Sequence, residues 1–165
     1  MTDERPRYSL FEIERRWLVD RDLVGDLENA PFRRIDDLYV EGTRLRLRKV
    51  LSPDGETEYK LGKKYGNRSR FSEPITTLYL TELEYLRLSA LPGSLISKRR
   101  YSVEGGSLDL FDPPNDEVTI FELEFESDQE AAAYAPPPFV EREVTGDPSF
   151  TCFALATRDH PITRL

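Results

Sequence analysis

The segment FEIERRWLVD, residues 11–20, carries charged side chains at every second position. Because successive side chains of a strand point to opposite faces, Glu12, Glu14 and Arg16 would share one face, while the other face is mainly apolar and includes Trp17. A surface strand shows a polar face to water, and that is one interpretation of this pattern. The other is that the charged face lines the inside of an enclosure.

The same separation of charge recurs along the chain. Single-signed polar faces occur as Arg-x-Arg-x-Arg at residues 44–48, Lys-x-Arg at 98–100 and Glu-x-Glu-x-Glu at 122–126. A solvated face more often mixes signs, because like charges at neighbouring positions repel one another. Separate acidic and basic stripes therefore favour a concave site that receives metal ions on one side and a polyanion on the other.

Strand patterns dominate the sequence and predict an α+β, mainly β, fold. Strands are expected in the ranges 11–19, 37–50, 56–66, 68–80, 94–103, 105–112, 118–127 and 139–145. Thr81 with Glu84, and Ser127 with Glu130, have the spacing of a helix-capping box, and a short final helix is expected within 148–157. An antiparallel sheet of about eight strands can close into a barrel with room for one small ligand. We therefore expect a closed or nearly closed antiparallel β-barrel, a tunnel, with flanking helices on its apolar outer face.

The composition narrows the class of protein. A chain of 165 residues, with 38% apolar and 33% charged residues, is expected to form a single domain over residues 1–165. The 31 acidic residues exceed the 23 basic ones, giving a net charge of −8. This balance argues against binding to a nucleic-acid polymer or to an anionic membrane, which depends on positive charge.

Two residue types limit the chemistry. The one cysteine, Cys152, cannot form an internal disulfide and is expected to be a small buried apolar residue. The one histidine, His160, lies in a tail next to proline, which argues against Ser-His-Asp or Cys-His catalysis. There is no apolar stretch of a signal peptide or of about 20 residues for a membrane span, so a cytoplasmic location is expected.

Taken in order, the charged motifs resemble the CYTH domain, or triphosphate tunnel metalloenzyme, family. The first strand of that family carries Glu-x-Glu-x-Lys, which Glu12 and Glu14 match, with Arg16 in place of the lysine. The series continues through Arg46 and Arg48, the segment YKLGKK that ends in Lys64, Lys98 with Arg100, Asp109, Glu122 with Glu124, and Glu143. The resemblance covers nearly the whole chain.

The resemblance implies roles for these residues. The groups that bind phosphoryl oxygens would be Arg46, Arg48, Lys60, Lys64, Lys98 and Arg100, together with Arg16. The ligands of Mg²⁺ or Mn²⁺, hard ions that prefer carboxylate oxygens, would be Glu12, Glu14, Asp109, Glu122 and Glu124. The catalytic residues would be Glu12, Glu14, Arg16 and Glu143. For Asp109 and Glu143, a salt bridge in the barrel wall is the alternative role. Arg16 keeps the positive charge of the family's lysine but cannot release a proton near neutral pH.

We therefore expect an enzyme, a metal-dependent hydrolase of inorganic tripolyphosphate or of a nucleoside triphosphate. An adenylate cyclase or a thiamine triphosphatase on the same fold is an alternative, although Trp17 lies on the apolar face and is expected to pack beneath a helix rather than to stack on a substrate. A non-catalytic triphosphate-binding module and a purely structural sheet protein are the other classes. Metal-dependent turnover would separate an enzyme from a binder. Association into a homodimer is suggested by relatives alone.

Overall fold

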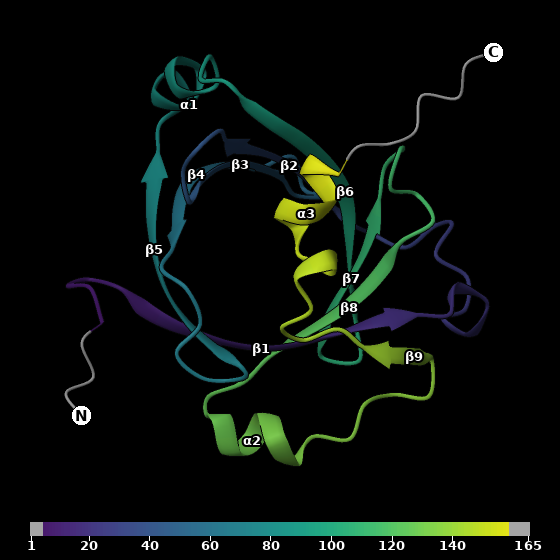
Figure 1. Cartoon of the computed structure of the whole chain (residues 1–165). Coiled ribbons are helices and arrows are strands. Elements are labelled where there is room, and N and C mark those ends of the chain that lie inside the picture. The colour runs from purple at the N-terminus through teal and green to yellow at the C-terminus, as the bar shows by residue number, and fades with distance from the viewer. Residues whose placement is uncertain (1–4, 159–165) are drawn as a thin grey trace.

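The computed structural model describes residues 5–158 and contains a closed antiparallel β-barrel (Figure 1). Eight strands form a ring in the order β1-β5-β4-β3-β2-β6-β7-β8, in which β8 pairs again with β1. A ninth strand, β9, pairs with β1 outside the ring. The expected barrel is therefore confirmed.

The elements have the following bounds. The strands are β1 (Leu10–Val19), β2 (Arg33–Val40), β3 (Leu45–Leu51), β4 (Thr57–Lys64), β5 (Ser72–Leu80), β6 (Gly93–Val103), β7 (Gly106–Phe111), β8 (Thr119–Glu124) and β9 (Val140–Glu143). The helices are α1 (Glu82–Leu88), α2 (Asp128–Ala133) and α3 (Cys152–Thr157), with two short 3-10 helices, η1 (Arg21–Leu23) and η2 (Pro148–Phe150). None of the helices within residues 5–158 is long and apolar enough to cross a membrane.

The eight barrel strands are not quite the eight strands predicted. The range 37–50, expected as one strand, is divided into β2 and β3 by a turn in which Gly42 has a φ of 68°, a conformation that glycine adopts without a steric penalty. The range 139–145 forms β9, which lies outside the ring. Its side chains therefore do not line the interior as the sequence suggested.

The outer face of β1, β7 and β8 carries one apolar core. Trp17 is 2% exposed and stacks on Phe121, with 5.8 Å between ring centroids. It also contacts Tyr134 at the end of α2, with 5.7 Å between centroids, so the expected packing of Trp17 beneath a helix is confirmed. Both predicted capping residues, Thr81 and Ser127, stand at the starts of helices α1 and α2.

The second apolar core lies inside the barrel. Figure 1 shows α3 within the ring of strands rather than against its outer face. Leu155 of α3 is 1% exposed and packs in a cluster with Ile96, Phe111, Val118 and Ile120. The final helix was predicted, but its position differs from the expected flanking one: part of the barrel interior is filled by the end of the described chain.

Candidate active site

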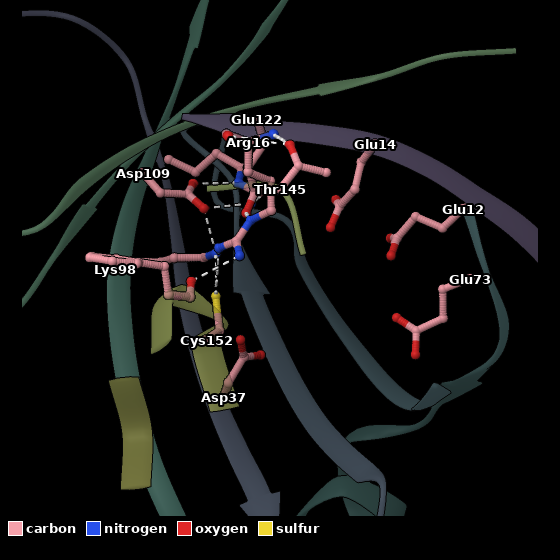
Figure 2. A network of polar contacts seen from close by, with 12 residues as sticks. Glu12, Glu14, Arg16, Asp37, Glu73, Lys98, Asp109, Glu122, Thr145 and Cys152 are labelled. Carbon is pink, nitrogen blue, oxygen red and sulfur yellow. Dashed lines mark hydrogen bonds and ion pairs between the residues drawn. The ribbon is translucent and has the colours of Figure 1, made fainter. Parts of the chain in front are cut away.

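The strand register brings the charged faces together. Glu14 and Arg16 of β1 lie opposite Glu124 and Glu122 of β8, respectively. Arg100 of β6 lies opposite Asp109 of β7. Figure 2 shows the carboxylates of β1 and β8 in one space with charged groups from the other strands. The sequence-based assignment of these side chains to shared faces is confirmed.

Five of these residues form a network that we call the paired cluster. The members are Arg16, Lys98, Arg100, Asp109 and Glu122. Arg100 donates two hydrogen bonds to Asp109, each 2.6 Å long, and a third of 2.6 Å to Glu122. Lys98 also donates to Asp109, and Arg16 Nε donates to the other oxygen of Glu122 at 3.0 Å. Each carboxylate is therefore shared between two cations.

The cations of the paired cluster keep Glu122 ionised. Burial disfavours the charged form of Glu122, but the nearby charges of Arg100, Lys98 and Arg16 hold its pKa well below its ordinary value. Asp109 has no exposed surface. Since cations of the chain already occupy their oxygens, Asp109 and Glu122 act here as counter-ions, which differs from the metal-binding role expected for them. For Asp109 the salt-bridge alternative agrees with the structure.

Arg48 and Arg46 of β3 differ in how far they are neutralised. Arg48 makes a bidentate pair with Asp37 of β2, with distances of 2.6 and 2.7 Å. Arg46 Nε lies 3.9 Å from Asp37 and, among the described residues, this buried nitrogen has no hydrogen-bond partner. The pairing role of Asp37 was missed, because one aspartate in β2 does not form a repeating pattern. Arg46 offers donor capacity to a ligand.

A second group of charges, the acidic cluster, consists of Glu12, Glu14, Glu73 and Lys64. Lys64 Nζ lies 2.6 Å from a carboxylate oxygen of Glu12, 3.7 Å from one of Glu73 and 4.0 Å from one of Glu14. Figure 2 shows the three glutamates side by side at the interior face. Glu73 was missed in the sequence because Pro74, next to it, left the pairing of that strand uncertain. One ammonium thus faces three carboxylates.

The acidic cluster is under-neutralised. Burial, and then the charge of Glu12, raise the pKa of Glu14 to about 7. Burial also disfavours the ionised form of Glu12, but Lys64 holds the pKa of this group below its ordinary value. The pKa of Glu124 is raised by burial and then by Glu12. An added cation would relieve this repulsion.

The acidic cluster suits a metal ion that keeps other ligands. Within residues 5–158, no three ligating side chains converge closely enough to form a complete metal site. Mg²⁺ commonly binds through one or two carboxylates and completes its shell with water and substrate phosphate oxygens. Two carboxylates of the acidic cluster could supply such a partial set of ligands, whereas a metal enclosed entirely by protein groups does not fit.

Lys60 of β4 supplies a further interior cation. Its Nζ lies 3.1 Å from Glu58 and 5.1 Å from the ring centre of Tyr79. Glu58 is the more exposed partner, with 49% of its side chain accessible. Because exposed ion pairs contribute little free energy, this contact leaves Lys60 available to a ligand.

The structure corrects the expected place of Glu143. Its two carboxylate oxygens accept hydrogen bonds of 2.9 and 2.8 Å from Arg15, and these bonds lower the pKa of Glu143. Arg15 also donates to the carbonyl oxygens of Ala131 and Tyr134. Since β9 lies outside the ring, Glu143 belongs to a salt bridge that fastens α2 and β9 to β1, and it does not reach the acidic cluster.

Arg16 and Cys152 also differ from expectation. Arg16 Nη1 donates to the carbonyl oxygen of Phe150 at 2.8 Å, so its guanidinium faces the C-terminal segment of the described chain. Cys152 is half-buried, and its sulfur lies 3.6 Å from Lys98 Nζ and 3.9 Å from Arg16 Nη2. It is therefore not a purely apolar core residue. His160 lies outside the described residues.

The interior of this closed barrel thus carries both basic and acidic side chains. The chain is 32% identical over 153 residues to the inorganic triphosphatase of Nitrosomonas europaea, covering 89% of this chain and 97% of that protein. It therefore belongs to the same family as that triphosphatase. No model of a known protein family matches the sequence.

Solved structures agree with this assignment. The crystal structure of the inorganic triphosphatase NE1496 has a TM-score of 0.57 and 26% identity, covering 90% of this chain and 95% of that one. A second crystal structure, of the hypothetical protein NE1496, has a TM-score of 0.56 and 28% identity, covering 88% of this chain and 97% of that one.

Proposed function

We propose that the chain is a metal-dependent hydrolase of inorganic tripolyphosphate, of the CYTH or triphosphate tunnel type. The observation that carries the proposal is that two groups share one barrel interior. One is Arg46, whose buried Nε has no hydrogen-bond partner among residues 5–158, and the other is the acidic cluster, with one ammonium among three carboxylates. The inorganic triphosphatase of Nitrosomonas europaea, 32% identical to this chain, supports inorganic tripolyphosphate as the first substrate to test.

The basic residues would neutralise and orient the phosphate chain. Arg46 can grip two phosphoryl oxygens through its planar fork, and Lys60 and Lys64 can each bind one as point charges. Transfer of a phosphoryl group leaves little covalent work for a protein, so that catalysis depends mainly on positioning and charge stabilisation. Lys98 and Arg100 already share Asp109 and would bind substrate less strongly than Arg46.

The acidic residues would hold the metal and the attacking water. Glu12 and Glu73 would hold Mg²⁺ or Mn²⁺. When bound, the metal supplies charge neutralisation to the phosphate and lowers the pKa of water. An oxygen of Glu14, whose pKa is about 7, would accept the proton as water attacks a terminal phosphorus. The P–O bond to the remaining diphosphate breaks, giving orthophosphate and pyrophosphate.

A panel of substrates tests the proposal. Phosphate release would be measured from tripolyphosphate, ATP and thiamine triphosphate, with Mg²⁺ or Mn²⁺ and with a chelator. We expect chelator-sensitive release from tripolyphosphate, with KM raised more than tenfold by Arg46→Gln. The matched control is Arg34→Gln, because Arg34 instead pairs with Asp112, and its KM should be unchanged.

Other outcomes would replace the proposal with an alternative. Cyclic nucleotide and pyrophosphate formed from ATP would identify a cyclase. Preferred release from thiamine triphosphate would identify that triphosphatase. Thermal stabilisation by tripolyphosphate with no turnover of any substrate would identify a non-catalytic binding module.

A further inference from the structure

The side chain of Arg16 is bound by other groups of the protein. These contacts suggest a role for Arg16 that the pattern of charges in the sequence does not indicate. We propose that Arg16 is a positioning residue that fastens the segment 150–157 inside the barrel, and that it does not bind the triphosphate. The second half of this statement rests on the proposed function. The first half concerns the fold and stands without it.

Each nitrogen of the Arg16 guanidinium faces a group of the protein. Nε donates to Glu122 at 3.0 Å, Nη1 donates to the carbonyl oxygen of Phe150 at 2.8 Å, and Nη2 lies 3.9 Å from the sulfur of Cys152. The residue is 7% exposed. A guanidinium with these partners would have to give up contacts with Phe150 and Cys152 to bind a phosphate.

The backbone of Arg16 holds the chain a few residues before this segment. The N–H of Arg16 donates to the hydroxyl of Thr145 at 2.9 Å, and its carbonyl oxygen accepts from the N–H of Val144 at 2.8 Å. Figure 2 shows Thr145 and Cys152 close to Arg16. Arg16 thus binds the chain at residues 144 and 145, where it leaves β9 and turns into the barrel.

The segment has a separate apolar anchor at its other end. Leu155 is 1% exposed among Ile96, Ile120 and their neighbours, and its carbonyl oxygen accepts a hydrogen bond of 3.1 Å from Asn115. A lysine at position 16 would keep the positive charge but could not present a fork of donors to Glu122 and Phe150 at once. The arginine side chain therefore matters for its shape as well as for its charge.

Fastening this segment also decides which cations a substrate can reach. The sulfur of Cys152 lies 3.6 Å from Lys98 Nζ, so the segment covers the paired cluster. Among the described residues, Arg46 and Lys64 form no hydrogen bond or ion pair with residues 150–157. The tripolyphosphate is then confined to the part of the interior that holds Arg46 and the acidic cluster.

Amide hydrogen exchange on the full chain tests the proposal. Arg16→Lys should raise the exchange rate of amides in 150–157 at least tenfold, change other regions less than twofold, and leave KM for tripolyphosphate within threefold. Leu155→Ala should free the same segment from its apolar end, with KM also within threefold. In the double variant the effects should fall short of the product of the two single effects, because both substitutions release one element. Arg48→Lys, which weakens the buried pair with Asp37, is the control and should leave exchange in 150–157 unchanged.

Two results would contradict the proposal. If Arg16→Lys raises KM tenfold or more while residues 150–157 stay protected, Arg16 is a phosphate ligand and the proposal is wrong. If the lysine variant does not fold, Leu155→Ala decides: a tenfold rise in KM on release of the segment would contradict the claim that the segment lies apart from the substrate. Wild-type protein without turnover would remove the proposed function, but the exchange rates would still show whether Arg16 fastens the segment.

Discussion

Replacing Glu14 with glutamine should make the protein more stable at alkaline pH while removing its activity. The pKa of Glu14 rises from 4.5 to about 7 because of burial and the neighbouring Glu12. An acid whose pKa is higher in the folded state than in the unfolded state favours folding when it is protonated. The folded state therefore loses stability as pH rises from about 4.5 through 7, and glutamine, which stays neutral, removes this loss.

The size of the effect follows from the two pKa values. Each tenfold difference in proton affinity is worth about 1.4 kcal/mol, so ionised Glu14 costs the folded state about 3 kcal/mol at pH 8. At pH 5 the folded protein keeps Glu14 protonated, and the cost is only about 1 kcal/mol. The stability gained by Glu14→Gln should thus grow by about 2 kcal/mol between pH 5 and pH 8.

Urea unfolding at both pH values, with a chelator present, measures this difference. Any constant effect of the amide cancels in the comparison. Glu41→Gln is the control, since Glu41 is an exposed residue in the turn between β2 and β3. Its free energy of unfolding should change between pH 5 and pH 8 by the same amount as that of the wild type. If the free energy of unfolding of Glu14→Gln also changes by the same amount as that of the wild type, the claim that Glu14 carries an unneutralised buried charge is refuted.

Three further predictions follow from single contacts. Asp109→Asn should lower the free energy of unfolding by about 3–5 kcal/mol, because it leaves Lys98 and Arg100 buried without a full counter-ion; urea unfolding checks this, and a loss below 1 kcal/mol would contradict it. Arg46→Gln should weaken tripolyphosphate binding by about 1.5–3 kcal/mol with an unchanged melting temperature, measured by calorimetry and thermal unfolding; unchanged affinity would exclude Arg46 as a ligand. Thr81→Ala should cost about 1 kcal/mol through loss of the α1 cap and leave KM unaltered, which a chemical denaturation series and an activity assay would test.

Much of the fold was predictable because strand alternation in this chain is strong. The faces of β1, β6, β7 and β8 follow directly from period-two patterns such as Glu12-x-Glu14-x-Arg16. The division of 37–50 into two strands was missed, since a turn at Gly42 interrupts an otherwise continuous pattern. The position of α3 inside the ring was missed for another reason: an apolar helix face shows that it is buried, but not against which core.

The residues of the site were easier to predict than their partners. Sequence placed Glu12, Glu14, Arg46 and Lys64 on inward faces, and the structure has them there. A salt bridge was an alternative for Asp109, but the sequence did not identify Arg100 and Lys98 as its partners, because ion pairs between strands depend on register, which alternation alone does not fix. The ion-pair partners therefore separate the interior cations into those that already have an acidic partner and those that are available to a ligand.

Hydrolysis of tripolyphosphate inside the barrel is tested by the balance of its two products. Purified protein with Mg²⁺ or Mn²⁺ should release orthophosphate and pyrophosphate in equal amounts, Glu14→Gln should release neither, and a chelator should stop the wild type. Equal release that persists in Glu14→Gln and with chelator would contradict the proposed mechanism, because it would place the reaction outside the acidic cluster of the barrel.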